Sequence, residues 1–162
     1  MTRFEPAVFT LADALRARGW RIATAESCTG GLIAAACTAV AGSSDWFERG
    51  FVTYSNEAKA DLLGVPAALI ANCGAVSAEV ACAMAEGALV HSRAQLAVAV
   101  TGIAGPGGGS AAKPVGTVWV ALVETGRVAR AELLQLAGDR TAVREQTVHV
   151  ALALLLASAR AA

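Results

Sequence analysis

The chain carries little charge of either sign and gathers none of it into runs. Of its 162 residues 16% are charged, and thirteen basic residues balance thirteen acidic ones. Nucleic-acid binding draws mainly on phosphate neutralisation by a basic surface, so this balance argues against direct contact with DNA or RNA. A hydrophobic fraction of 56% places the chain among globular proteins. So small a charged fraction also favours a homo-oligomer, in which a second subunit covers part of the surface.

Long apolar segments of the kind that membrane insertion requires are also missing. The most apolar stretch, residues 150–159, is too short to span a bilayer, and residues 1–6 do not form the apolar centre of a signal peptide. We therefore expect a cytoplasmic protein with no membrane partner. A length of 162 residues suits one domain, and no linker or internal repeat divides residues 1–162.

Metal-ligating residues are few and poorly spaced for a metal site. The histidines are His91 and His149 alone, and the four cysteines form no C-x-x-C pair. A zinc site is therefore not expected, and neither a metal nor an organic cofactor is predicted. In a reducing compartment the cysteines would stay thiols, three of them as small buried residues: Cys37, Cys73 and Cys82. Cys28 differs because it stands in a polar loop beside a serine.

Helical and β-like patterns alternate along the chain. Apolar spacing and stop signals predict helices over residues 4–18, 30–40, 56–63, 78–92 and about 141–159. Runs typical of strands cover residues 20–25, 50–54, 96–100, 117–123 and 128–136. This order predicts an α/β fold, a three-layer α/β/α sandwich with a mixed, largely parallel sheet. Ligands usually bind such a sheet beyond the carboxyl ends of its strands, where three loops of this chain are expected to lie.

The first loop is a polar, glycine-containing turn that runs from Glu26 to Gly31 between a strand and a helix. Such a turn aims backbone N–H groups and the positive end of the helix at one point, which makes a candidate oxyanion site. Ser27 lies where a nucleophile elbow places its serine, although the G-x-S-x-G pattern is absent. On pattern alone, Ser27 or Thr29 is equally well explained as a helix cap, and Cys28 is a rival thiolate nucleophile.

The second loop brings a tyrosine and a lysine close together in the sequence. Tyr54 ends an expected strand, and Lys59 lies four residues after Ser55, on the same face of the next helix. A serine nucleophile needs a base, and Lys59 can act as one if burial and the positive end of the helix after Ser27 lower its pKa. Tyr54 would then orient the amine or pass a proton. A solvated lysine and a strand-end aromatic residue are the more common explanations of such a pattern.

The third loop, residues 102–116, is dense in glycine, which lets a backbone approach a ligand closely. A strand follows it, unlike in a dinucleotide-binding fingerprint, and Lys113 precedes Pro114, unlike in a Walker A loop. A phosphate nest with Lys113 as an added charge remains open, and so does a flexible connection. Further on, Arg140 has the fork of donors that clamps a phosphate, but it would equally pair with an acidic neighbour.

Together these segments resemble the CinA C-terminal family, the competence-damage-inducible domain that includes bacterial nicotinamide-nucleotide amidohydrolases. The resemblance runs in order from about Ala23 to the end of the chain. The segments that carry it are TAESCTGGLIAAACT (24–38), GSSDWF (42–47), VTYSNEAKADLLGV (52–65), GAVS (74–77), AVTGIAGPGGG (99–109), KPVGTVWVAL (113–122) and GDR (138–140). One departure is Arg49, where the family usually shows a second glycine beside Gly50, and we expect it to alter a turn.

The resemblance implies a single amidohydrolase domain over residues 1–162, with Ser27 as nucleophile and Tyr54 and Lys59 as its catalytic partners. The implied reaction is deamidation of nicotinamide mononucleotide to nicotinic acid mononucleotide, with release of ammonia. The alternative is a nucleotide-binding or regulatory module without catalysis, linked to competence or the response to DNA damage. The residues expected to bind the substrate or its phosphate are Glu26, Cys28, Thr29, Gly30, Gly31, Thr101, Gly102, Gly105, Lys113 and Arg140.

Overall fold

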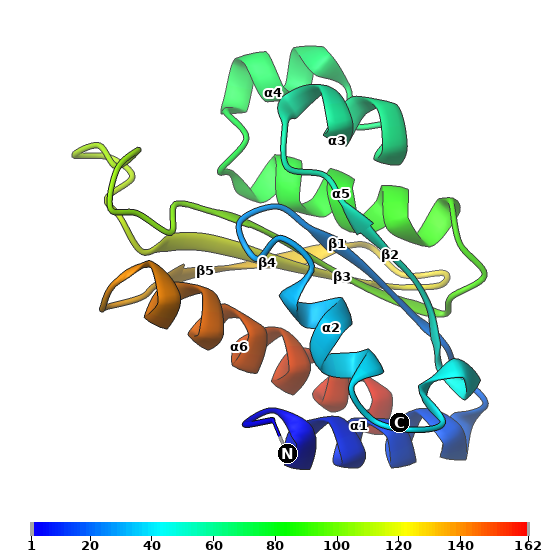
Figure 1. Cartoon of the computed structure of the whole chain (residues 1–162). Coiled ribbons are helices and arrows are strands. Elements are labelled where there is room, and N and C mark those ends of the chain that lie inside the picture. The colour runs from blue at the N-terminus through cyan, green and yellow to red at the C-terminus, as the bar shows by residue number, and fades with distance from the viewer. Residues whose placement is uncertain (1, 162) are drawn as a thin grey trace.

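One sheet between two layers of helices forms the fold (Figure 1), in a computed structural model that describes residues 2–161. The strands are β1 (Ile22–Glu26), β2 (Phe47–Val52), β3 (Leu96–Gly102), β4 (Thr117–Glu124) and β5 (Arg130–Gln135). The helices are α1 (Glu5–Arg18), α2 (Leu32–Thr38), α3 (Asn56–Leu63), α4 (Ala67–Cys73), α5 (Ala78–Val90) and α6 (Arg140–Arg160), with a short 3₁₀ turn at Ser43–Asp45. The predicted α/β/α sandwich is confirmed.

The sheet has the strand order β2-β1-β3-β4-β5. β1 pairs in parallel with both β2 and β3, whereas β4 pairs antiparallel with both β3 and β5. Within the described residues β4 is therefore the one strand that runs against the others, and the sheet is mixed and largely parallel, as predicted. Because β1 and β3 are parallel neighbours, their carboxyl ends and the loops that follow them meet at one edge of the sheet.

The two faces of the sheet carry side chains of different size. Towards α3, α4 and α5, the central strands present alanines such as Ala23, Ala25 and Ala97. Towards α2 and α6, they present larger residues such as Ile22 and Val98, and α1 packs on the outer side of α6 (Figure 1). Alternate strand residues point to opposite faces, so the alternation of small and large residues lets α5 lie close to one face while α6 fills the other.

The structure differs from the sequence prediction at β2 and α4. β2 begins at Phe47, three residues before the predicted residue 50. The prediction missed this start because Glu48 and Arg49 are polar and interrupt the apolar pattern typical of a strand. Arg49 lies inside this strand opposite Ala23, so the expectation of an altered turn is wrong. α4 was not predicted, since Pro66 looks like the end of a helical region but is the N-cap of a new one.

Candidate active site

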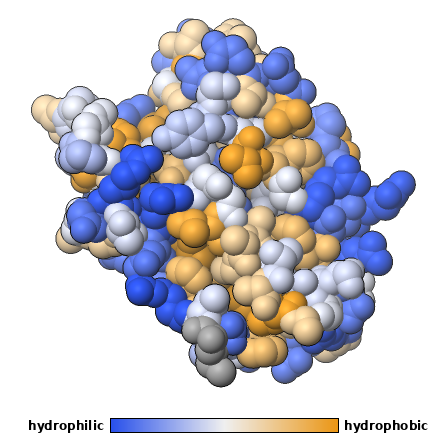
Figure 2. Space-filling model, viewed as in Figure 1, coloured by the Kyte–Doolittle hydropathy of each residue, from blue (hydrophilic) through white to orange (hydrophobic). Residues whose placement is uncertain are grey.

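A cleft of about 190 Å³ lies at the carboxyl ends of β1 and β3. All three predicted loops contribute to its wall, together with a segment between α4 and α5. Figure 2, in the view of Figure 1, shows hydrophilic residues gathered beside the projecting loop and over the start of α6. The residues that line the cleft are Ser27, Cys28, Tyr54, Asn56, Lys59, Ala75, Val76, Thr101, Gly102, Ala104 and Arg140.

A lysine and a serine meet at the floor of this cleft. Ser27 is the first residue after β1, and its backbone N–H donates to the Val100 carbonyl of β3 at 3.1 Å, which fixes the turn to the sheet. Lys59 extends from α3 with only 1% of its surface exposed. Its Nζ lies 3.1 Å from the Oγ of Ser27, so the structure brings together two residues that are 32 positions apart in the sequence.

The amine of Lys59 has three hydrogen-bond partners of two kinds. Nζ donates to the carbonyl oxygens of Thr53 at 3.0 Å and Tyr54 at 3.2 Å, and it contacts the Ser27 hydroxyl. Carbonyls only accept, whereas a hydroxyl also donates. A neutral amine can therefore give its two hydrogens to the carbonyls and keep its lone pair for the proton of Ser27. Burial lowers the pKa of Lys59, because desolvation disfavours the charged amine.

Glu26 has a different place from the one predicted. Its buried carboxylate accepts hydrogen bonds from Thr29 Oγ1 at 2.6 Å and from the backbone N–H groups of Ile33 at 2.8 Å and Ala34 at 3.0 Å. Glu26 therefore holds the start of α2, and it does not face the cleft. The alternative that Ser27 or Thr29 caps this helix is therefore wrong, and so is the expectation that Glu26 binds the substrate, because Glu26 does not line the cleft.

The position of Glu26 also rules out one of the two expected causes of the lowered pKa of Lys59, the positive end of the helix after Ser27. Because Glu26 occupies the N-terminal N–H groups of the short helix α2, the positive end of that helix faces a negative charge. The lowered pKa of Lys59 comes from its burial instead. The Ser27 hydroxyl does not cap α2, and it faces the amine of Lys59.

Tyr54 contributes two groups that lie apart. Its backbone carbonyl accepts from Lys59, whereas its side chain is 62% exposed and its phenolic oxygen accepts from Arg140 Nη2 at 3.3 Å. Arg140 also donates through Nη1 to the carbonyl of Gly105 at 2.8 Å. The phenol is thus paired with Arg140 and not with the amine of Lys59, and the geometry offers no direct proton relay between the two side chains.

Some predicted binding residues support the cleft without lining it, whereas Thr101 and Gly102 do line it. Lys113 donates to the Cys73 carbonyl at 3.2 Å and so ties the glycine loop to the end of α4. The N–H of Gly30 donates to the carbonyl of Ser27 at 3.1 Å, the Thr29 hydroxyl donates to Glu26, and neither the Thr29 side chain nor Gly31 lines the cleft. Thr101 lines the cleft and donates to the carbonyl of Ala75 at 2.9 Å.

Cys28 lines the cleft but is a poor candidate nucleophile. Its side chain is buried, and this burial raises its pKa to about 11. The thiolate is the reactive form of cysteine, so Cys28 stays a weakly reactive thiol near neutral pH.

Sequence reasoning missed four residues of the lining and one behind it. Asn56 lies within the segment from Tyr54 to Lys59 that forms the second predicted loop, so its position offered a signal. Ala75, Val76 and Ala104 are small or apolar residues that carry no chemical signal in a sequence. Arg144 lies in the second turn of α6 and donates to carbonyls of the first loop, a contact between segments more than 100 residues apart.

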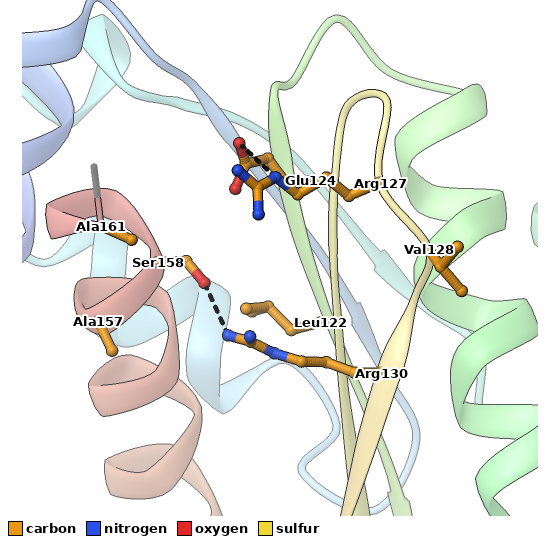
Figure 3. A pocket seen from close by; sticks show the side chains of 8 residues that line it. All are labelled: Leu122, Glu124, Arg127, Val128, Arg130, Ala157, Ser158 and Ala161. Carbon is orange, nitrogen blue, oxygen red and sulfur yellow. Dashed lines mark hydrogen bonds and ion pairs between the residues drawn. The ribbon is translucent and has the colours of Figure 1, made fainter.

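A second hollow, of about 270 Å³, lies at the other end of the sheet between α6 and the β4–β5 hairpin (Figure 3). It is lined in part by Glu124, which pairs with Leu96 at the start of β3. Its charged groups already have partners, since Arg130 donates to Ser158 Oγ at 3.1 Å and Arg127 pairs with Glu124 at 3.5 Å. None of the predicted site residues lies there.

Two further features bear on the chemistry and setting of the site. Within residues 2–161, no group of three or more His, Cys, Asp or Glu side chains is placed to hold a metal ion. Of the helices in the same range, none combines the length and the apolar character of a membrane span.

Comparisons with known proteins agree on one family. The sequence model of the CinA C-terminal domain matches residues 5–159. The chain is 56% identical over 146 residues to the nicotinamide-nucleotide amidohydrolase PncC of Escherichia coli strain K12, which covers 88% of this chain and 87% of that protein. It is 57% identical over 146 residues to PncC of Pseudomonas putida, covering 90% and 91% of the two chains.

Other relatives are longer or have solved structures. The chain is 53% identical over 143 residues to a CinA-like protein of Syntrophobacter fumaroxidans, covering 88% of this chain but only 34%, about a third, of that protein. The crystal structure of the competence/damage inducible protein CihA from Agrobacterium tumefaciens matches with a TM-score of 0.93 and 47% identity, over 97% of this chain and 96% of that chain.

Proposed function

The chain belongs to the CinA C-terminal domain family, and we propose that it is a nicotinamide-nucleotide amidohydrolase that uses Ser27 as its nucleophile. Relatives that carry this activity in their names match the chain over most of both lengths. The observation that supports the mechanism is the contact of 3.1 Å between the buried amine of Lys59 and the hydroxyl of Ser27. A hydroxyl becomes a nucleophile when a base within hydrogen-bond reach removes its proton.

The proposed reaction has two halves. Neutral Lys59 takes the proton of Ser27 as Oγ attacks the carboxamide carbon of nicotinamide mononucleotide, and the carbonyl oxygen becomes an oxyanion. When the C–N bond breaks, Lys59 returns the proton to the leaving nitrogen, and ammonia departs from an acyl-enzyme ester. Water then attacks the ester with Lys59 again as base, which releases nicotinic acid mononucleotide and restores Ser27.

Backbone N–H groups of the first loop would stabilise the oxyanion. The N–H of Ser27 is held by β3, and that of Gly30 by the Ser27 carbonyl. Within residues 2–161, the N–H groups of Cys28 and Thr29 make no backbone hydrogen bond. These two groups, next to the nucleophile, are the donors we assign to the oxyanion hole. The N–H of Gly30, in the same turn, is already paired and is not assigned to the oxyanion hole.

Arg140 and Tyr54 are the groups we assign to the rest of the substrate. The guanidinium of Arg140 lines the cleft and offers the planar fork that suits a phosphate. Tyr54 presents an exposed ring at the same place, and an aromatic face attracts the positive charge of a pyridinium. The hydrogen bond between the two side chains would hold them ready for the nucleotide.

The test is coupled measurement of ammonia release with three substrates. Nicotinamide mononucleotide, its riboside and free nicotinamide share the carboxamide but differ in phosphate and sugar. We expect fast release from the mononucleotide and much slower release from the other two, because the latter lack the phosphate that Arg140 would bind. Absence of ammonia release from the mononucleotide would refute the proposed function.

A further inference from the structure

We infer that Arg144 is a positioning residue that orients the oxyanion hole by holding one peptide group of the Ser27 turn. The inference rests on the proposed function, since it concerns the donors assigned to the oxyanion. Arg144 lies one helical turn after Arg140 in α6, and it does not line the cleft. Its action would therefore pass through the backbone of the first loop.

The guanidinium of Arg144 bridges two successive carbonyls. Nε donates to the carbonyl of Cys28 at 3.2 Å, and Nη2 donates to the carbonyl of Thr29 at 3.0 Å. The Thr29 carbonyl has a second donor, the N–H of Leu32 at 3.1 Å. The Cys28 carbonyl has no other donor within residues 2–161, so the peptide between Cys28 and Thr29 depends on Arg144.

That peptide carries one of the two assigned oxyanion donors. In a planar trans peptide the C=O and the N–H point in opposite directions. Because Arg144 holds the Cys28 carbonyl on the α6 side of the turn, the N–H of Thr29 points away from Arg144. Without this contact the peptide is free to rotate, and half a turn would aim a carbonyl at the oxyanion in place of an N–H. A carbonyl there would repel the charge that the site must stabilise.

Lysine cannot replace arginine fully at this position. A guanidinium presents several donors in one rigid plane and serves both carbonyls at once, whereas an ammonium acts as a point charge on a flexible chain. The neighbouring Arg140 holds the Gly105 carbonyl in a similar way, so the first turns of α6 connect the first and the third loop. Arg144→Lys should therefore keep part of the effect of Arg144, and Arg144→Ala should lose it.

The first experiment measures ammonia release from nicotinamide mononucleotide by wild type, Arg144→Ala, Arg144→Lys and the control Arg160→Ala. Arg160 is an exposed arginine at the opposite end of the same helix. Removal of an oxyanion-hole donor costs about 10²–10³ in kcat, so we expect a loss of about a hundredfold for Arg144→Ala. KM should stay near the wild-type value, because the ground-state carbonyl draws far less on these donors. The kcat of Arg144→Lys should fall between those of wild type and Arg144→Ala, and the kcat of Arg160→Ala should match that of wild type.

The second experiment is independent of the amide substrate. A fluorophosphonate probe forms a bond between Ser27 Oγ and phosphorus while fluoride leaves, and the phosphonyl oxygen occupies the place of the oxyanion. Labelling of Ser27, followed by mass spectrometry, should slow in Arg144→Ala by a factor similar to the loss in kcat. Added guanidinium should restore part of the labelling rate in Arg144→Ala but leave Arg160→Ala unchanged.

The outcomes separate the inference from the function on which it rests. Wild-type kcat and labelling in Arg144→Ala would overturn the role of Arg144 and leave the amidohydrolase standing. A loss confined to KM would overturn it as well. If wild type releases no ammonia but labels at Ser27 in an Arg144-dependent way, the proposed substrate fails and the positioning role stands. If wild type neither releases ammonia nor labels, both are refuted.

Discussion

At each of two ends of this sheet a basic side chain lies beside a serine hydroxyl, with the same distance between nitrogen and oxygen. At the carboxyl ends of β1 and β3, Lys59 Nζ lies 3.1 Å from Ser27 Oγ. At the opposite end, Arg130 Nη2 lies 3.1 Å from Ser158 Oγ (Figure 3). The distances do not distinguish the pairs. The chemistry does, because a lysine can lose its proton inside a protein, whereas an arginine keeps its own.

Burial completes the difference between the two pairs. Lys59 is enclosed, and its pKa is lowered by that burial, whereas Arg130 lies at the surface. Both hydroxyls line a hollow, so the difference between the two pairs lies in the basic group and not in the serine. A cation–serine contact therefore indicates catalysis only when the cation can act as a base.

The largest expected effect comes from removing the two serines in turn. Ser27→Ala should lower kcat by about three orders of magnitude or more while the nucleotide still binds, because the nucleophile is gone and Arg140 remains. Ser158→Ala, the matched variant at the other end, should keep wild-type turnover. For both variants, ammonia release measures turnover, and equilibrium binding of nicotinamide mononucleotide measures affinity. Near-normal turnover in Ser27→Ala would contradict the assignment of the nucleophile.

Removing the two cations should give the next largest difference. A positioned general base contributes about 10²–10⁴ in rate, so Lys59→Met should lose rate within that range and regain part of it at raised pH, where hydroxide replaces the base. Methionine fills most of the volume of the lysine and limits damage to packing. Arg130→Met should retain activity at every pH. If Lys59→Met works at the wild-type rate at neutral pH, Lys59 has no role in catalysis.

The smallest effect is expected at Cys28. Its pKa of about 11 leaves the thiol protonated near neutral pH, so Cys28→Ala should keep turnover of the same order as wild type. Comparison with Ser27→Ala in the same ammonia assay separates a serine from a cysteine amidase. Loss of activity in Cys28→Ala together with retained activity in Ser27→Ala would reverse the two roles.

Local signals in the sequence predicted most of the fold. The apolar run of β3 and the helices α3 and α6 all appear where they were expected. The missed parts are those where the local signal is ambiguous. Pro66 both follows one helix and begins another, and β2 is an edge strand whose polar residues depart from the β pattern.

The sequence predicted the main residues of the site but not the contacts that they make. The sequence and its family resemblance indicated Ser27 and Lys59, but only the fold shows that two carbonyls share the amine. Glu26 was expected among the substrate-binding residues, yet its oxygens accept hydrogen bonds from the first turn of α2. Arg144 had no sequence signal at all, since its partners are backbone carbonyls more than 100 residues away.

The central claim is that the buried amine of residue 59 is ready to lose its proton, and titration of that amine by NMR tests it most directly. Lysines labelled with ¹³C at Cε report their own charge, and Lys59→Met identifies the signal. A lowered pKa means that the neutral base becomes available at lower pH than in an ordinary lysine, so kcat/KM should rise with pH through the same value. We predict a midpoint clearly below the ordinary value of about 10.4. A midpoint at or above that value would contradict the account.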